Sequence, residues 1–169
     1  GRGRPPLVFY PFPRSLALPP PLWIPIVPMS DFIIAVAAAI VREGRVLAMR
    51  RAPPNDAGPG LWETVSGRLE PDEQPIDAIA REIAEETGLA IGSEIALEER
   101  PVDAYVARRG ERPMCVGFYA ARATSGAVRR SSEHDDHAWL TPEELAARGS
   151  PPRLVEAVRR ALQALGESS

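Results

Sequence analysis

Lysine is absent from this 169-residue chain, so arginine supplies all 20 of its basic side chains. Each cation is therefore a planar fork that can contact a phosphate through two hydrogen bonds. Acidic residues number 23, and the net charge is −3. A chain with this charge is poorly suited to hold nucleic acid by neutralising its phosphates, so we expect no nucleic-acid partner.

Cysteine and long hydrophobic runs are also scarce. Cys115 is the single cysteine and cannot form an internal disulfide, which fits a reducing compartment and predicts a cytoplasmic protein. Because it lies in the apolar run MCVGFYAA, we expect Cys115 to be a small core residue rather than a reactive thiol. The longest apolar run, residues 32–41, has ten residues. That is about half of the ~20 needed to cross a bilayer, so we expect no membrane partner.

Proline is concentrated at the start of the chain. Residues 1–30 hold nine of the 19 prolines, three arginines and no acid. Since proline lacks the N–H that helices and sheets require, we expect an irregular N-terminal extension there and one ordered domain over residues 31–169. The prolines also interrupt any signal-peptide core. We expect Met29 to be the natural initiator, with residues 1–28 read from upstream sequence.

From residue 32 onward, strand-like and helix-like segments alternate, which predicts an α/β fold with a mixed β-sheet covered by helices. Short helices are predicted from a capping-box start at Thr141 and, by apolar periodicity, over residues 154–165. A loop rich in Pro, Gly, Asn and Asp is predicted at residues 52–60. The predicted strands cover residues 32–41, 46–51, 61–67, 96–106 and 114–123.

The longest helix is predicted between Asp72 and Gly88. Asp72 is a suitable N-cap, and Pro75 falls in the first turn, where a missing N–H costs nothing. Gly88 suits a left-handed C-terminal cap. One face of this helix carries the apolar residues Ile76, Ile79 and Ile83.

The acidic residues of this helix are unusually crowded. Glu82, Glu85 and Glu86 fall within an arc of roughly 100°. Carboxylates near the helix C-terminus are also disfavoured by its dipole, by ~0.3–1 kcal/mol each. Arg81 is predicted to point to one side of the arc, whereas a divalent cation such as Mg²⁺ or Mn²⁺ would relieve the repulsion. A solvated charged face is the alternative interpretation.

The spacing Gly67-x5-Glu73-x7-Arg81-Glu82-Ile83-x-Glu85-Glu86-x-Gly88-Leu89 resembles the Nudix box at all nine of its constrained positions. The box covers residues 67–89, and the surrounding strand order is similar to a Nudix domain over about residues 31–165. The resemblance implies an α/β/α sandwich. It also implies a hydrolase that uses Mg²⁺ or Mn²⁺ to cleave a nucleoside diphosphate linked to another moiety.

The resemblance also assigns roles to box residues. Glu82, Glu85 and Glu86 would be catalytic metal ligands, and the carbonyl of Ser66 would reach the metal as well. Glu73 and Arg81 would pair and hold the loop against the helix. Gly67 would permit a tight turn. Many relatives have Gly-Gly where this chain has Ser66-Gly67. This difference affects the expected backbone geometry of the loop and leaves the acids unchanged.

The general base of such a hydrolase can be a box glutamate or an acid on a later loop. In the segment SSEHDDHAWL we expect a loop in which Glu133 is a metal ligand or base, and a polar loop acid is the alternative. A zinc site with His134 and His137 is a weaker alternative, because Nudix-like metal binding needs no histidine.

Four residues outside the box are candidates for substrate contact. Arg50 and Arg51 end a strand, so alternation allows only one of them to face a phosphate. Trp62 could stack on a nucleobase, although core packing is the favoured interpretation, as it is for Trp139. Tyr105 lies where relatives that cleave dinucleoside polyphosphates have a tyrosine.

Other functions remain open alternatives at this level. A non-catalytic Nudix-fold sensor would bind a nucleotide without cleaving it, and such modules commonly lose box acids that this chain keeps. An isomerase of isoprenoid diphosphates is a third class, which the intact box and the single cysteine disfavour. The expected partner is a small nucleotide-type molecule, a homodimer is possible, and specificity resides in loops that the sequence does not resolve.

Overall fold

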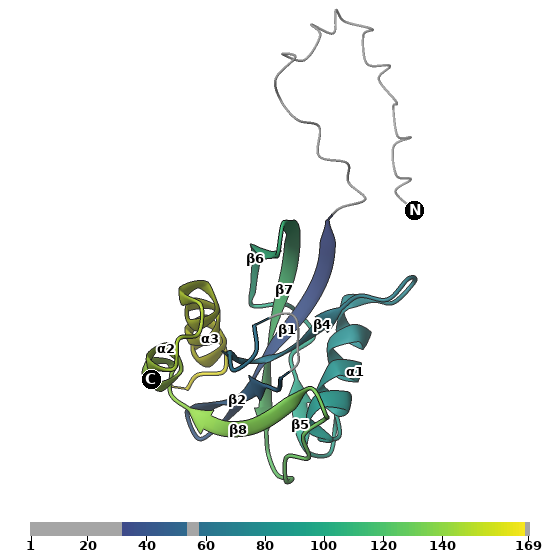
Figure 1. Ribbon diagram of the computed structural model, residues 1–169. Helices are drawn as coiled ribbons and strands as arrows, with labels where there is room; N and C mark the ends of the chain where they lie inside the picture. The colour runs from purple at the N-terminus through teal and green to yellow at the C-terminus, as the bar shows by residue number, and fades with distance from the viewer. Residues whose placement is uncertain (1–31, 54–57, 168–169) are drawn as a thin grey trace, which may run out of the picture.

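A computed structural model describes residues 32–53 and 58–167 (Figure 1). The expected N-terminal extension over residues 1–30, the expected start at Met29 and the centre of the predicted loop at 52–60 lie outside the described residues. Within the described parts, the longest helix has 13 residues, and none of the helices is long and apolar enough to cross a membrane.

The described strands form one mixed sheet of eight strands. Its main path has the order β3-β2-β1-β7-β5, while β4 pairs with β1, β6 with β7 and β8 with β2. The β1–β7 pair is parallel and the other named pairs are antiparallel, which confirms the predicted mixed sheet. The strands are β1 (Ile33–Arg42), β2 (Arg45–Arg51), β3 (Trp62–Glu63), β4 (Val65–Arg68), β5 (Ile95–Leu97), β6 (Asp103–Arg109), β7 (Arg112–Ala123) and β8 (His134–Leu140).

Helices cover both faces of this sheet, so the predicted sandwich is confirmed. Helix α1 (Pro75–Thr87) lies on one face, and α2 (Pro142–Ala147) and α3 (Pro152–Ala164) lie on the other (Figure 1). Strand β1 is buried on both faces, since its side chains alternate between the two cores. Ala35, Ala37 and Ala39 belong to the core under α3, and the residues between them belong to the core under α1.

The ends of the helices agree with the sequence in part. Gly88 adopts a left-handed φ of 65° and its N–H bonds to the carbonyl of Ala84, as predicted. Thr141 forms the predicted capping box with Glu144. The predicted N-cap of α1 is wrong, because Gln74 occupies that position without a side-chain cap and Asp72 instead has a φ of 66° in the preceding turn.

Several strand boundaries differ from the predictions. The single strand expected at 61–67 is two strands, because β3 pairs with β2 while β4 pairs with β1. Residues 96–106 likewise divide into β5 and β6, both paired with β7. The polar segment expected to be a loop contains β8, which extends along β2. In each case the division follows from which strand each segment pairs with, and the sequence of the segment alone does not reveal that partner.

The prediction for Cys115 is wrong, because its side chain is exposed. Alternation along β7 directs the buried residues Val116 and Phe118 to the interior, and Cys115 faces the other way. Trp139 is partly buried against the core under α1, with the Arg42 guanidinium 4.6 Å from the centre of its ring.

Candidate active site

The three crowded acids of α1 occupy different environments. Glu86 is almost fully buried, with 6% of its surface exposed. The side chain of Glu82 is 13% exposed and that of Glu85 is 59% exposed. The helix therefore presents the acids as a gradient from solvent to interior, which excludes a uniformly solvated charged face.

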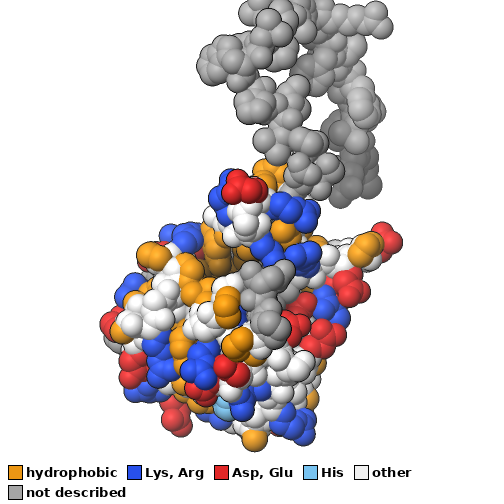
Figure 2. Space-filling view, viewed as in Figure 1, with side chains coloured by type: hydrophobic (Ala, Val, Ile, Leu, Met, Phe, Trp, Pro, Cys, Tyr) orange, Lys and Arg blue, Asp and Glu red, His pale blue; other side chains and the backbone are white. Residues whose placement is uncertain are grey.

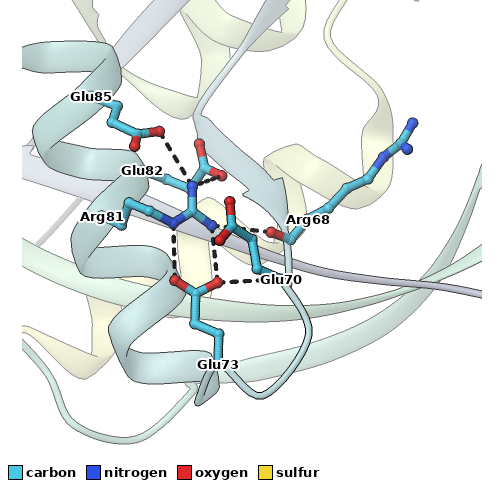
Figure 3. Close-up of polar contacts among 6 residues, drawn as sticks. All are labelled: Arg68, Glu70, Glu73, Arg81, Glu82 and Glu85. Carbon is cyan, nitrogen blue, oxygen red and sulfur yellow. Dashed lines mark hydrogen bonds and ion pairs between the residues drawn. The ribbon is translucent and has the colours of Figure 1, made fainter.

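Arg81 lies among these acids rather than to one side of them (Figure 3). Its Nη1 is 2.8 Å from Oε1 of Glu82 and 3.2 Å from Oε2 of Glu85, which corrects the predicted orientation. Its Nε and Nη2 donate to the two carboxylate oxygens of Glu73 at 2.9 and 3.0 Å, so the predicted Glu73–Arg81 pair is confirmed. Hydrogen bonds from Arg81 lower the pKa of Glu73, and the neighbouring acids raise the pKa of Arg81.

Gly67 is explained by close packing rather than by a turn. It lies within β4, opposite Val36 of β1, and its φ lies outside the left-handed region. A Cβ atom added at Gly67 would be 1.7 Å from Oε1 of Glu82 and 1.9 Å from its Cδ. The absence of a side chain at this position therefore gives the carboxylate of Glu82 its place, which corrects the predicted role.

Glu86 carries the strongest electrostatic perturbation at the site. Burial raises its pKa to about 9, and the negative charges of Glu63, Glu82 and Glu133 act in the same direction. The backbone N–H of Ser66 donates to this carboxylate and partly offsets the effect. Among the described residues, Oε2 of Glu86 is buried without a hydrogen-bond partner. A group of this kind is neutral, or else it has a cationic partner.

The acids around Glu86 fit a hard divalent cation by their chemistry. Carboxylate oxygens are the ligands that Mg²⁺ and Mn²⁺ prefer, and the partnerless Oε2 of Glu86 is an available donor atom. Over residues 32–53 and 58–167, no three acidic, histidine or cysteine side chains already converge closely enough to hold a metal. Arg81 contacts two of the candidate ligands, Glu82 and Glu85.

Glu133 reaches the site from the turn that precedes β8. The N–H of Ala52, directly after β2, donates to the carbonyl of Glu133 at 2.9 Å and holds this turn. The side chain is exposed, and its charge acts on both Glu82 and Glu86. The structure therefore places Glu82, Glu86 and Glu133 within electrostatic reach of one another, from α1 and the β8 turn.

Glu63 is a site residue that the sequence did not reveal. Its Oε1 is 2.6 Å from Nε of Arg51 and 3.3 Å from Nε2 of His134, whose side chain is buried. A two-residue strand gives no periodic signal, so only its position shortly before the box could have indicated Glu63. His134 and His137 lie on either side of a register shift in β8, where they align with Arg51 and Met49 of β2. Over the described residues no group of three acidic, histidine or cysteine side chains could hold a metal, which gives the alternative of a shared zinc site no geometric support.

The four candidate substrate residues divide into two pairs. Arg51 and Tyr105 line a cavity of about 690 Å³ that begins at the acids. Arg50 points away from it and pairs with Asp135 at 2.7 Å. Trp62 is 8% exposed and belongs to the core under α3, which confirms the interpretation as core packing. The structure does not bring Arg50 or Trp62 into the cavity.

The cavity connects two chemically different ends. We call the side with Glu63, Glu82, Glu133, Ser66 and Arg51 the acidic end, and the side with Tyr105, Met114, Val116, Leu154 and Arg153, from β6, β7 and α3, the far end. The lining also includes Arg68, Arg108 and Arg109. Figure 2 shows hydrophobic side chains gathered between α3 and the β6–β7 hairpin, with charged side chains around them. Such a cavity suits a molecule with one anionic part, bound with a cation, and one flat or apolar part.

Comparison with known proteins agrees with this arrangement. The family model described as the NUDIX domain matches residues 31–165. The chain is 36% identical to a MutT-like protein of Streptomyces ambofaciens over 118 residues, which are 68% of this chain and 68% of that protein. It is 31% identical to the CTP pyrophosphohydrolase of Escherichia coli strain K12 over 115 residues, which are 66% of this chain and 78% of that protein.

A solved structure supports the fold independently. The crystal structure of a MutT protein from Methanosarcina mazei Go1 is similar with a TM-score of 0.68 and 22% sequence identity. The match covers 80% of this chain and 96% of that chain. At this identity the similarity concerns the fold alone.

Proposed function

Because the chain belongs to the Nudix family, and is thus a hydrolase that acts on phosphoric anhydride bonds, we propose that it uses Mg²⁺ or Mn²⁺ to cleave a nucleoside diphosphate linked to another moiety. The observation that carries this proposal is the buried Oε2 of Glu86, which has no partner among the described residues and is surrounded by acids. A cation at such a position would suit a hydrolase of phosphoric anhydrides, because its substrate is anionic.

Nucleoside triphosphates are the substrate class that we favour, because a triphosphate is a nucleoside diphosphate linked to phosphate. Support comes from the similarity of the chain to the CTP pyrophosphohydrolase of Escherichia coli strain K12. The two-ended cavity is consistent with it, since phosphates would lie near the acids and Arg51, and the base near Tyr105.

The predicted acids and Ser66 would have defined tasks. Glu82, Glu85, Glu86 and Glu133, with the carbonyl of Ser66, would hold the cation. When bound, the cation would neutralise phosphate oxygens and lower the pKa of an attacking water. Arg81 would then retain Glu73 and release Glu82 and Glu85.

Two further residues would act on the substrate and the water. Arg51, held by Glu63, would direct its remaining N–H groups to a phosphate oxygen. Glu133 would accept the proton of the water, because its exposed carboxylate lines the cavity, and a box glutamate is the alternative base.

A sensor module that binds a nucleotide without cleaving it is the second candidate function. Such a module needs no buried ionisable acid at its centre, whereas this chain maintains Glu86 there at an electrostatic cost. The intact set of box acids therefore favours catalysis.

The test is a panel of nucleotides incubated with the purified chain and Mg²⁺, with and without EDTA, and analysed for phosphate-containing products. We expect turnover that EDTA abolishes and that Glu86→Gln reduces at least 100-fold, of the order seen when a catalytic electrostatic group is removed. Arg159→Gln is the matched control, because Arg159 pairs with Glu143 on the surface. Metal-dependent binding without any turnover would instead support the sensor.

A further inference from the structure

Arg153 stands at the far end of the cavity, away from the acids. It lies in the first turn of α3, and its guanidinium carbon is 4.8 Å from the centre of the Tyr105 ring. A cation near a helix N-terminus is opposed by the helix dipole, and α3 has no acid in its first turn to compensate. Helix stability therefore does not explain an arginine at this position.

A buried carboxylate fixes the orientation of this guanidinium. Nη2 of Arg153 is 2.9 Å from Oδ1 of Asp103 in hydrogen-bonding geometry and 2.7 Å from Oδ2 as an ion pair. The Asp103 side chain is only 5% exposed. With Asp103 at one edge and the Tyr105 ring beneath, the guanidinium plane has little freedom to rotate.

Arg160 provides an internal comparison. It pairs with the same Asp103, through Nη1 at 3.1 Å from Oδ1. Arg160 does not line the cavity, whereas Arg153 does. The two arginines therefore share a structural partner, and they differ in access to a ligand.

Arg153 lines the cavity and retains unused hydrogen-bond donors. Its hydrogen bond to Asp103 uses one N–H of Nη2. The second N–H of Nη2 and the neighbouring N–H on Nε or Nη1 therefore remain as one two-donor edge for a ligand. Two adjacent N–H donors in one plane match two adjacent acceptors in the plane of a ligand. The pairing of the strands gives the distance between the two ends of the cavity. Arg68, on the same strand as Ser66, pairs with Ala35 of β1, which pairs with Val116 of β7, which pairs with Tyr105 of β6. These are three strand spacings, about 14 Å at ~4.8 Å each, so an extended nucleotide can have its phosphates at the acids and its base at Arg153.

We propose that Arg153 is a specificity-determining residue that selects nucleobases with two adjacent hydrogen-bond acceptors. This inference rests on the proposed function. Guanine offers such a pair at O6 and N7, and cytosine offers one at O2 and N3. Adenine places an amino donor beside N7, which would oppose the arginine, and uracil has an N–H between its two carbonyls. The expected order is GTP and CTP above ATP and UTP.

The experiment measures kcat/KM for GTP, CTP, ATP and UTP with Mg²⁺ in the full chain and in three variants. We expect the full chain to favour GTP or CTP over ATP by about 10-fold or more, in the range of one bidentate base contact. Arg153→Gln should remove this preference and move it towards ATP, because glutamine pairs with adenine through one donor and one acceptor. Arg153→Lys keeps the charge beside Asp103 without the planar fork, and should also remove the preference.

Arg160→Gln is the matched control and should leave the ratio of the four kcat/KM values unchanged. If GTP is preferred over CTP, Arg153 recognises the O6 and N7 edge of guanine. The reverse order would identify O2 and N3 of cytosine as the recognised edge. An unchanged ratio in both Arg153 variants, or a full chain that favours ATP, would overturn the inference while leaving the hydrolase intact. No turnover of any nucleotide would instead contradict the proposed function.

Discussion

The buried carboxyl of Glu86 makes the stability of the metal-free protein depend on pH. Its pKa is about 9 in the folded chain, against 4.5 for an ordinary glutamate. Because the folded pKa is raised, the folded state binds a proton that the unfolded state has released. Stability is therefore fully present below about pH 4.5 and declines as the pH rises towards 9. We predict that Glu86→Gln abolishes this decline.

The size of the effect follows from the two pKa values. One pKa unit corresponds to about 1.36 kcal/mol. Between about pH 5 and pH 8 the folded state keeps this proton and the unfolded state does not, so the folding equilibrium constant falls by nearly three powers of ten. The metal-free chain should thus lose on the order of 4 kcal/mol of unfolding free energy over this interval from Glu86 alone. Typical domains have 5–15 kcal/mol in total, so a loss of this size is readily measured.

The assay is urea unfolding in EDTA at a series of pH values, followed by circular dichroism. At about pH 8 Glu86→Gln should be more stable than the unaltered chain by several kcal/mol, and near pH 5 the two should be similar. Glu85→Gln is the matched control, since its exposed side chain gains little from losing its charge.

Two results would refute this reasoning. Parallel pH profiles for Glu86→Gln and the unaltered chain would show that Glu86 is not neutral in the folded state. A variant that is less stable at all pH values would show that the ionised carboxylate has a stabilising partner. Addition of Mg²⁺ supplies an independent readout, because a ligand of the folded state should stabilise the unaltered chain more at high pH.

Two further predictions concern packing and capping. Gly67→Ala should reduce turnover at least 10-fold at nearly unchanged stability, because the new Cβ displaces the Glu82 carboxylate from a position 1.7 Å away; steady-state kinetics with thermal unfolding tests this, and full activity would contradict it. Thr141→Ala should lower the unfolding free energy by ~1 kcal/mol through loss of the capping box, with kcat unchanged; urea unfolding measures it, and no change in the midpoint would contradict it.

Local patterns predicted the part of the site that lies on one helix. The resemblance to the Nudix box implied the pair of Glu73 with Arg81. The spacing of Glu82, Glu85 and Glu86 and the left-handed Gly88 follow from helical geometry and backbone sterics over neighbouring residues. Such features need no knowledge of the rest of the chain, and the structure places them accordingly.

Residues whose roles depend on distant partners were not predictable in the same way. Glu63 enters the site because β3 pairs with β2, and Arg153 enters the cavity because α3 packs against β6 and β7. Cys115 lies in an apolar run and is nevertheless exposed, since alternation along β7 turns it away from the buried Val116 and Phe118. Gly67 has a spacing typical of a turn, but its explanation is the side chain of a helix 15 residues away.

The repulsion among the crowded acids is relieved in two different ways in the metal-free chain, and a cation that binds there must replace both. Arg81 neutralises the outer acids, Glu82 and Glu85, by direct hydrogen bonds. Glu86 lies too deep for that contact and is neutral because it keeps its proton. A cation held by all three carboxylates must displace Nη1 of Arg81 from Glu82 and Glu85, and a proton from Glu86. The bidentate bond to Glu73 gives Arg81 a position to retain after that exchange, which explains why these two residues are paired beside the acids.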